Sequence, residues 1–95
     1  MVVKGTTTSG IKFKLDSKIK DDARLLFLLT KAQNAEDTLA ASEAVMKLLE
    51  LVFGGQDNVY AFMCEVADKH KGVCDIKDML VEIQEMFDAI NAKNS

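Results

Sequence analysis

The chain has 95 residues, of which 48% are hydrophobic and 28% are charged, and it contains no Pro and no Trp. A chain of this length can bury one modest core and has little room for a deep catalytic cleft as well. Its formal net charge of -3 argues against nucleic acid as the main partner, because phosphate binding needs a basic face. With no signal-peptide run and no apolar stretch near the ~20 residues of a membrane span, we expect a cytosolic protein without a membrane partner.

The first 15 residues are predicted to form a β-hairpin. VVKGTTT is rich in β-branched residues, and IKFKLD alternates apolar with basic side chains, which places Ile11, Phe13 and Leu15 on one face. Thr8-Ser9-Gly10 supplies the turn, where glycine is free to adopt positive φ. A two-stranded hairpin is marginal alone, so its apolar face is expected to rest on helices.

Half of the twelve basic residues fall within the first 24 positions. We interpret them as a solvated hairpin edge, because lysines on edge strands block edge-to-edge aggregation. A phosphate-binding patch is the alternative. The residues concerned are Lys4, Lys12, Lys14, Lys18, Lys20 and Arg24.

Helices are predicted over residues 16–92, followed by a short tail at 93–95, all within a single domain spanning 1–95. The capping and stop residues set their limits: Asp16 or Ser17 to about Ala32, Thr38 to Phe53 before Gly54-Gly55, Asn58 to His70 after a cap at Asp57, and Ile76 to Ala92 after a cap at Asp75. The predicted fold is therefore mostly α, a small α+β protein with an N-terminal β-hairpin packed on a bundle of about four helices.

The predicted helices differ in the breadth of their apolar faces. The last one carries a single apolar arc, from which Glu82, Glu85 and Asp88 point away. The first is apolar almost all round, because the stretch LLFLL at Leu25–Leu29 fills both of its sides. Such a helix is either central in the fold or half covered by another chain, and the sequence leaves both alternatives open.

Few residues of this sequence are suited to catalysis or metal binding. Cys64, His70 and Cys74 have neither the compact spacing nor the fourth ligand of a structural zinc site, and nothing marks an oxyanion hole for a Cys–His pair. The acidic residues of the last helix are interpreted as a solvated face without calcium-loop spacing. We predict no catalytic residue, no cofactor and no metal, hence a protein that is not an enzyme. A helix-turn-helix DNA reader is disfavoured because the candidate recognition helices are acidic or neutral.

The order of these elements resembles the short tail assembly chaperones of long-tailed (siphovirus-type) phages and prophages of Gram-positive bacteria. The resemblance covers residues 3–90 and rests on hydrophobic patterns. Its strongest pieces are GTTTSGIKFKLD leading into a D-D-x-x-L-L-x-L-L helix, and VMKLLELVFGGQDNVYAF before an acidic terminal helix.

The resemblance implies a non-enzymatic chaperone that binds the tape-measure protein, keeps it soluble and helps recruit tail-tube subunits. It would act in the host bacterial cytoplasm and be absent from the mature virion. In many relatives a programmed frameshift makes a longer product, and Ala92-Lys93-Asn94 is compatible with the slippery codons GCA-AAA-AAC. The alternative is a small helical adaptor or regulatory protein that acts through protein–protein contacts.

A chaperone for helical clients needs apolar side chains that meet an amphipathic helix in a groove. Adaptable packing there is favoured by Met46, Met63, Met79 and Met86. The predicted partner contacts are Leu25, Phe27, Leu28, Phe53 and Tyr60, with core packing as the alternative for each. A homo-oligomer is also expected, because the first helix carries more apolar surface than a small fold can cover.

Overall fold

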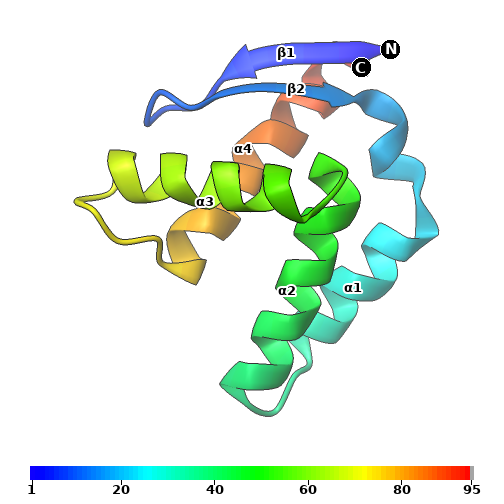
Figure 1. The fold of residues 1–95 in the computed structure, drawn as a ribbon. Coiled ribbons are helices and arrows are strands. Elements are labelled where there is room, and N and C mark those ends of the chain that lie inside the picture. The colour runs from blue at the N-terminus through cyan, green and yellow to red at the C-terminus, as the bar shows by residue number, and fades with distance from the viewer. Residues whose placement is uncertain (95) are drawn as a thin grey trace.

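The computed structural model describes residues 1–94, with side chains up to Ala92, and shows a two-stranded hairpin, a short 3₁₀ helix and four α-helices (Figure 1). In chain order the elements are β1 Val2–Thr6, β2 Lys12–Asp16, η1 Ser17–Asp21, α1 Ala23–Gln33, α2 Thr38–Phe53, α3 Gln56–Lys69 and α4 Ile76–Asn94. The predicted fold, a β-hairpin packed on a bundle of four helices, is confirmed.

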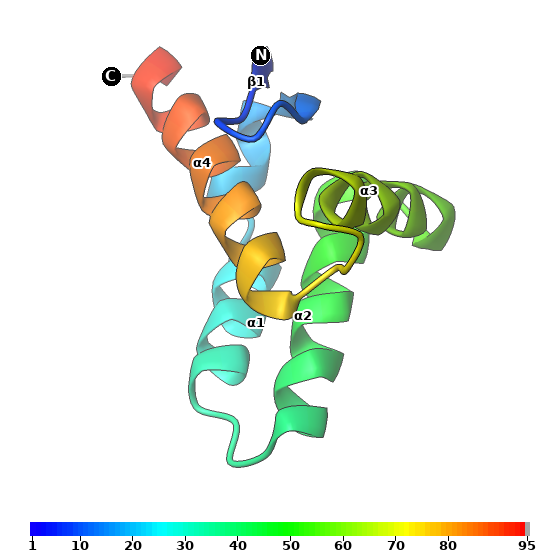
Figure 2. The ribbon, with the colours of Figure 1, turned by 90° about the vertical axis from the view of Figure 1, so that its left-hand side faces the viewer.

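The hairpin lies across one end of the molecule, where both termini also lie (Figures 1 and 2). Helices α1 and α2 form an antiparallel pair that extends away from the hairpin, and α4 crosses the bundle on the side opposite α3 (Figure 2). One cluster of buried apolar side chains joins the hairpin to all four helices of the described chain. No helix within residues 1–94 is long and apolar enough to span a membrane.

The hairpin follows its alternating sequence. Val3 pairs with Leu15 and Gly5 with Phe13 in the antiparallel register, and Val3, Phe13 and Leu15 are buried against the helices. The turn closes through the amide of Thr7, which donates to the carbonyl oxygen of Ile11 at 2.9 Å. As expected, Gly10 supplies the left-handed turn conformation, with φ of 103°.

Gly5 leaves room for the buried ring of Phe13, its cross-strand partner. A Cβ atom at Gly5 would lie 2.7 Å from Cζ of Phe13, so the ring would have to leave its place in the core. We expect Gly5→Ala to destabilise the protein by about 1–3 kcal/mol, as overpacking does. Urea denaturation measures the change, with Thr6→Ala on the outer face of β1 as the control. The free energy of unfolding of the control should stay within about 0.5 kcal/mol of wild type. An equal effect of the two substitutions would contradict the packing argument.

The prediction of one helix from Asp16 or Ser17 to Ala32 is wrong, because two aspartates divide the segment. Asp16 caps the 3₁₀ helix by accepting a hydrogen bond from the amide of Lys18 at 3.0 Å. Asp22 then adopts an extended conformation (φ -78°, ψ 117°) and accepts from the amide of Arg24 at 2.9 Å. An extended residue cannot continue a helix, so α1 begins only at Ala23.

The second predicted helix is confirmed from Thr38 to Phe53, with Gly54 in the left-handed region at φ 86°. The third begins earlier than predicted, because Gly55 occupies the N-cap position and Asp57 lies inside the first turn. Helix α4 continues to Asn94, two residues beyond the predicted end at about Ala92, and Ser95 of the predicted tail lies outside the described residues.

The stretch LLFLL is divided between core and surface. Leu25 is 6% exposed, whereas Leu26 and Phe27 are 68% and 65% exposed, and Leu28 and Leu29 are half-buried. Helix α1 lies beside α2 at the edge of the molecule (Figure 1). It is therefore not the central helix of the fold, and one of its faces stays open.

Candidate protein-binding surface

An apolar groove of about 330 Å³ opens between the α1–α2 pair and α4. We call it the α1–α4 groove. Its apolar lining comes from three helices: Leu29 and Ala32 from α1, Ala41, Val45 and Leu48 from α2, and Ile76, Leu80, Ile83 and Phe87 from α4. Two polar side chains, Gln33 and Gln84, complete the lining. A concave apolar site of this size, with a few polar groups, is typical of a binding site.

Local capping signals set the walls of the α1–α4 groove. Asp37 starts α2 by accepting a hydrogen bond from the amide of Ala40 at 2.7 Å, which reverses the chain after α1. Asp75 caps α4 in the same way, accepting from the amide of Lys77 at 2.7 Å. The cap therefore fixes where α4 begins, and with it the position of Ile76 in the groove.

Large apolar side chains also lie uncovered on both helices of the α1–α2 pair. Leu26 and Phe27 point outward from α1, and Leu39 is 71% exposed near the start of α2. The ammonium group of Lys31 lies 5.9 Å from the centre of the Phe27 ring, within cation–π range. Single exposed leucines are ordinary; several together on one helical pair indicate an interaction surface.

The structure does not bring the five predicted contact residues into one surface. Leu25 is buried in the core and offers no contact in this conformation, and Leu28 is half-buried. Phe27 lies on the outer side of α1. Phe53 is half-buried and stacks on the ring of Phe62, with 4.7 Å between the ring centres. Tyr60 is 67% exposed on α3.

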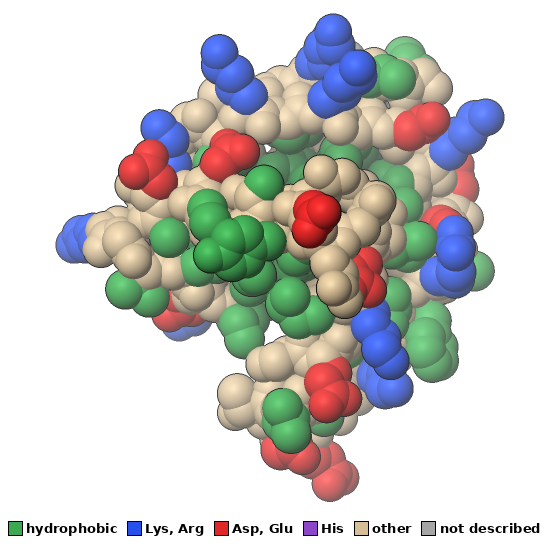
Figure 3. Space-filling model, viewed as in Figure 1, with side chains coloured by type: hydrophobic (Ala, Val, Ile, Leu, Met, Phe, Trp, Pro, Cys, Tyr) green, Lys and Arg blue, Asp and Glu red, His purple; other side chains and the backbone are tan. Residues whose placement is uncertain are grey.

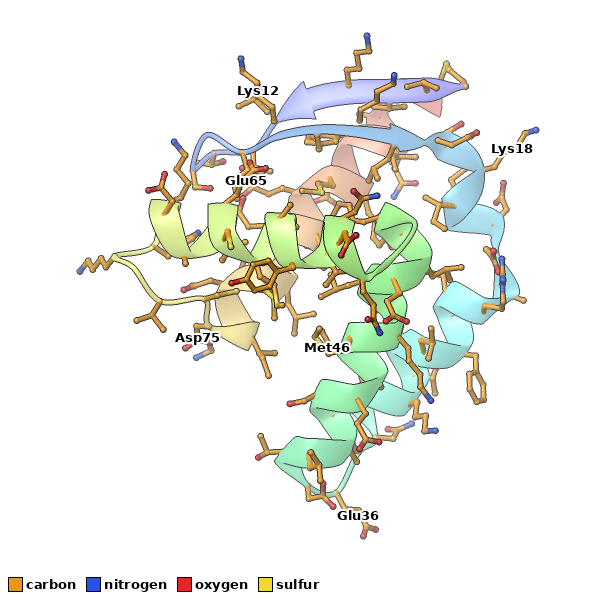
Figure 4. All side chains as sticks on the ribbon, viewed as in Figure 1. Lys12, Lys18, Glu36, Met46, Glu65 and Asp75 are labelled. Carbon is orange, nitrogen blue, oxygen red and sulfur yellow. The ribbon has the colours of Figure 1, made fainter. Side chains whose placement is uncertain are left out.

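Tyr60 belongs to a second apolar area, a shallow hollow between α2 and α3. Met46 and Met63 line it, with Glu50 and Asp57 as acidic neighbours. Figure 3 shows hydrophobic side chains gathered over α3 beside acidic groups, and Figure 4 places Met46 on the same face. Of the two areas, the α1–α4 groove is the more enclosed by apolar side chains, so it is the stronger candidate.

Glu82 corrects the prediction of a wholly solvated acidic face on the last helix. Its side chain is 1% exposed and holds three elements together. Ser9 Oγ donates to the two carboxylate oxygens at 2.9 and 2.8 Å, and Nε2 of His70 lies 3.1 Å from Oε2. One turn further along α4, Glu85 accepts hydrogen bonds from the amide and hydroxyl of Thr8 at 2.8 Å each.

The electrostatics of this cluster favour the ionised carboxylate. Burial alone would raise the pKa of Glu82, but hydrogen bonds from Thr7, Ser9 and His70 and the charge of His70 bring it below its ordinary value. Glu82 stands between the serine and the histidine. The hydroxyl therefore points to a carboxylate and not to an imidazole base, as nucleophilic activation would require. The arrangement anchors the hairpin turn to α3 and α4.

The two cysteines do not form a reactive centre with His70. Cys64 is exposed on α3, and Cys74 is partly buried before α4. Burial raises the pKa of the Cys74 thiol, and the nearby charge of Asp78 raises it further, which disfavours the reactive thiolate. Within residues 1–94 no three His, Cys, Asp or Glu side chains are grouped so that they could hold a metal ion.

Sequence reasoning missed the α1–α4 groove and the role of Glu82. The groove had a partial signal, because Leu29 and Ala32 share one side of α1 while Leu80 and Phe87 lie within the arc of α4. No pattern showed that these two arcs would face each other across a gap. No pattern in the sequence indicated the role of Glu82, since its partners Ser9 and His70 lie 73 and 12 positions away.

Fold and surface together define a small α+β protein with an open apolar groove between α1, α2 and α4. No family model matches the chain, and neither does any curated protein or solved structure.

Proposed function

We propose that this protein is a non-enzymatic phage tail assembly chaperone. It binds the tape-measure protein, keeps it soluble and helps recruit tail-tube subunits while the tail is built. It works in the cytoplasm of the bacterial host and is absent from the mature virion. The small helical adaptor, acting through the same kind of contact, is the alternative.

The α1–α4 groove is the observation that supports this proposal. A long helical client exposes amphipathic helices, and such a helix binds by laying its apolar face into an apolar groove. The groove offers leucine, isoleucine and phenylalanine side chains from three helices. The net charge of -3 would help to keep the complex in solution.

Co-expression with the long helical tail protein of the same phage tests the proposal. We expect the client to become soluble and to co-purify with the tagged chain. Leu80→Asp should reduce the co-purified client by about tenfold or more, because Leu80 is 40% exposed and lines the groove. A charge there would be buried without a partner in the complex.

Val81→Asp is the matched control. Val81 is the next residue of α4 and is 52% exposed, but it does not line the α1–α4 groove. The control should retain client, and thermal unfolding should show both variants folded. If both variants lose client equally, the groove is not the contact surface. If the client stays insoluble with wild type, the chaperone proposal fails and the adaptor takes its place.

A further inference from the structure

One edge of the hairpin has unused backbone hydrogen-bonding groups. Bonded and non-bonded pairs alternate along an antiparallel ladder, and the bonded pairs at its two ends are Thr7–Ile11 (2.9 Å) and Met1–Ser17 (2.8 Å). Counting from either end, Lys12 and Lys14 fall at non-bonded positions. Their N–H and C=O groups therefore point away from β1, and no hydrogen bond within the described chain uses them.

This free edge of β2 borders a groove, which we call the β2–α3 groove. It measures about 310 Å³ and runs between β2 and the side chains of Asn58, Ala61 and Glu65. Phe13 and Phe62 form part of its apolar lining. Figure 3 shows the molecule hollowed here between the hairpin and α3, and Figure 4 places Lys12 and Glu65 on its two sides.

The outer face of the hairpin is basic beside this edge at Lys12 and Lys14, whereas the acidic Glu65 lies across the groove on α3 and Asp16, at the end of β2, pairs with the N-terminal amino group. Lys4 and Lys14 are directly opposed across the hairpin, and Lys12 follows on the same face. Like charges directly opposite each other destabilise a sheet. No salt bridge of the described residues neutralises any of the three. Carboxylates placed beside them would relieve this repulsion.

We propose that the free edge of β2 binds an extended peptide segment by β-strand addition, and that the segment alternates acidic with apolar residues. Its backbone would pair with Lys12 and Lys14, as in other strand-addition complexes. Because side chains alternate between faces, its carboxylates would lie beside the lysines while its apolar side chains enter the β2–α3 groove. This site is separate from the α1–α4 groove and does not depend on the proposed function.

Short blocked peptides test the inference on the intact chain, with no client protein present. We expect a peptide of alternating valine and glutamate to bind at least tenfold more tightly than one of alternating valine and lysine, as measured by NMR titration. The largest amide shifts should fall at Lys12 and Lys14. Lys12→Gln with Lys14→Gln should weaken binding of the glutamate peptide, whereas Lys47→Gln on α2 should not.

Backbone methylation of the peptide separates strand addition from simple charge attraction. One version carries N-methyl groups on the glutamates only, the other on the valines only, so each loses the donors of one edge. Strand addition predicts that one version binds at least tenfold more weakly than the unmethylated glutamate peptide, and that the other version binds about as tightly as it. Equal binding of the two versions overturns the inference. So does equal binding of the glutamate and lysine peptides, or the absence of binding, which would leave the lysines as a guard against edge pairing.

Discussion

Replacing Glu82 by leucine is expected to destabilise the folded protein by about 3 kcal/mol. The substitution leaves Ser9 Oγ and Nε2 of His70 without the carboxylate that they contact, and each polar group left unsatisfied costs about 1–3 kcal/mol. The expected loss for the two groups stays at about 3 kcal/mol, since the His70 side chain is 24% exposed and water can solvate its ring nitrogen in part. Chemical denaturation at neutral pH measures the loss. A change within 0.5 kcal/mol, as at ordinary surface positions, would show that the cluster does not stabilise the fold.

Glu82→Gln tests the charge with little change of shape, and its effect should depend on pH. The pKa of Glu82 in the folded protein lies below its ordinary value of 4.5. The stabilisation by the carboxylate is therefore complete above pH 4.5 and is lost as the pH falls through the folded-state pKa. We expect wild type to be more stable than the variant at pH 7 and the difference to shrink at pH 3.

The comparison of Glu82→Gln with wild type also removes the contribution of other acids. Hydrogen bonding to Arg24 lowers the pKa of Asp22, and the amide of Lys18 lowers that of Asp16. Both shifts are shared by the two proteins, so they cancel in the difference. The same gap in stability at pH 7 and pH 3 would contradict an ionised Glu82 in the folded state.

The second large effect concerns neighbouring leucines in α1. Leu25→Ala is expected to destabilise the protein by about 2–5 kcal/mol, because it leaves a cavity where a buried side chain packed. Leu26→Ala should change stability by no more than about 0.5 kcal/mol. The side chains are identical and adjacent, but Leu25 is 6% exposed and Leu26 is 68% exposed. Urea denaturation at low protein concentration gives both values.

Concentration dependence makes the Leu26 experiment informative about the expected homo-oligomer. If Leu26→Ala destabilises the chain as much as Leu25→Ala does, the outer face of α1 is covered in solution. If that loss grows with protein concentration, the cover is a second copy of the chain. A small and concentration-independent effect leaves the face of Leu26 and Phe27 free for another partner.

Local signals determined most of the secondary structure of this chain. The alternation of residues 11–15 and the turn glycine produced the hairpin, and the glycine pair at 54 and 55 ended α2 at Phe53. These signals act over a few residues, so they can be seen in sequence. The exception follows the same reasoning: Asp22, six residues after Asp16, caps α1, while Asp16 caps the short 3₁₀ helix before it. Aspartate hydrogen-bonds nearby backbone groups at either position, so the sequence did not show that a second cap would divide the segment.

The tertiary structure decided which side of each helix is covered. The breadth of the apolar face on α1 predicted that something must cover it, but burial of Leu25 and exposure of Phe27 depend on how α1 rotates against α2. Of the five predicted contacts, Phe27 and Tyr60 are exposed, and they line different hollows. Helix rotation is set by packing against distant elements, which a periodic pattern does not encode.

The sequence by itself therefore determined the class of this protein: a small, mostly helical domain with a hairpin, more apolar surface than its core needs, and no motif for chemistry. Only the tertiary structure assembled the α1–α4 groove, left the edge of β2 free beside α3, and buried Glu82 against Ser9 and His70. Each of these features joins residues far apart in the chain. Their energies come from contacts that exist only once the helices have packed.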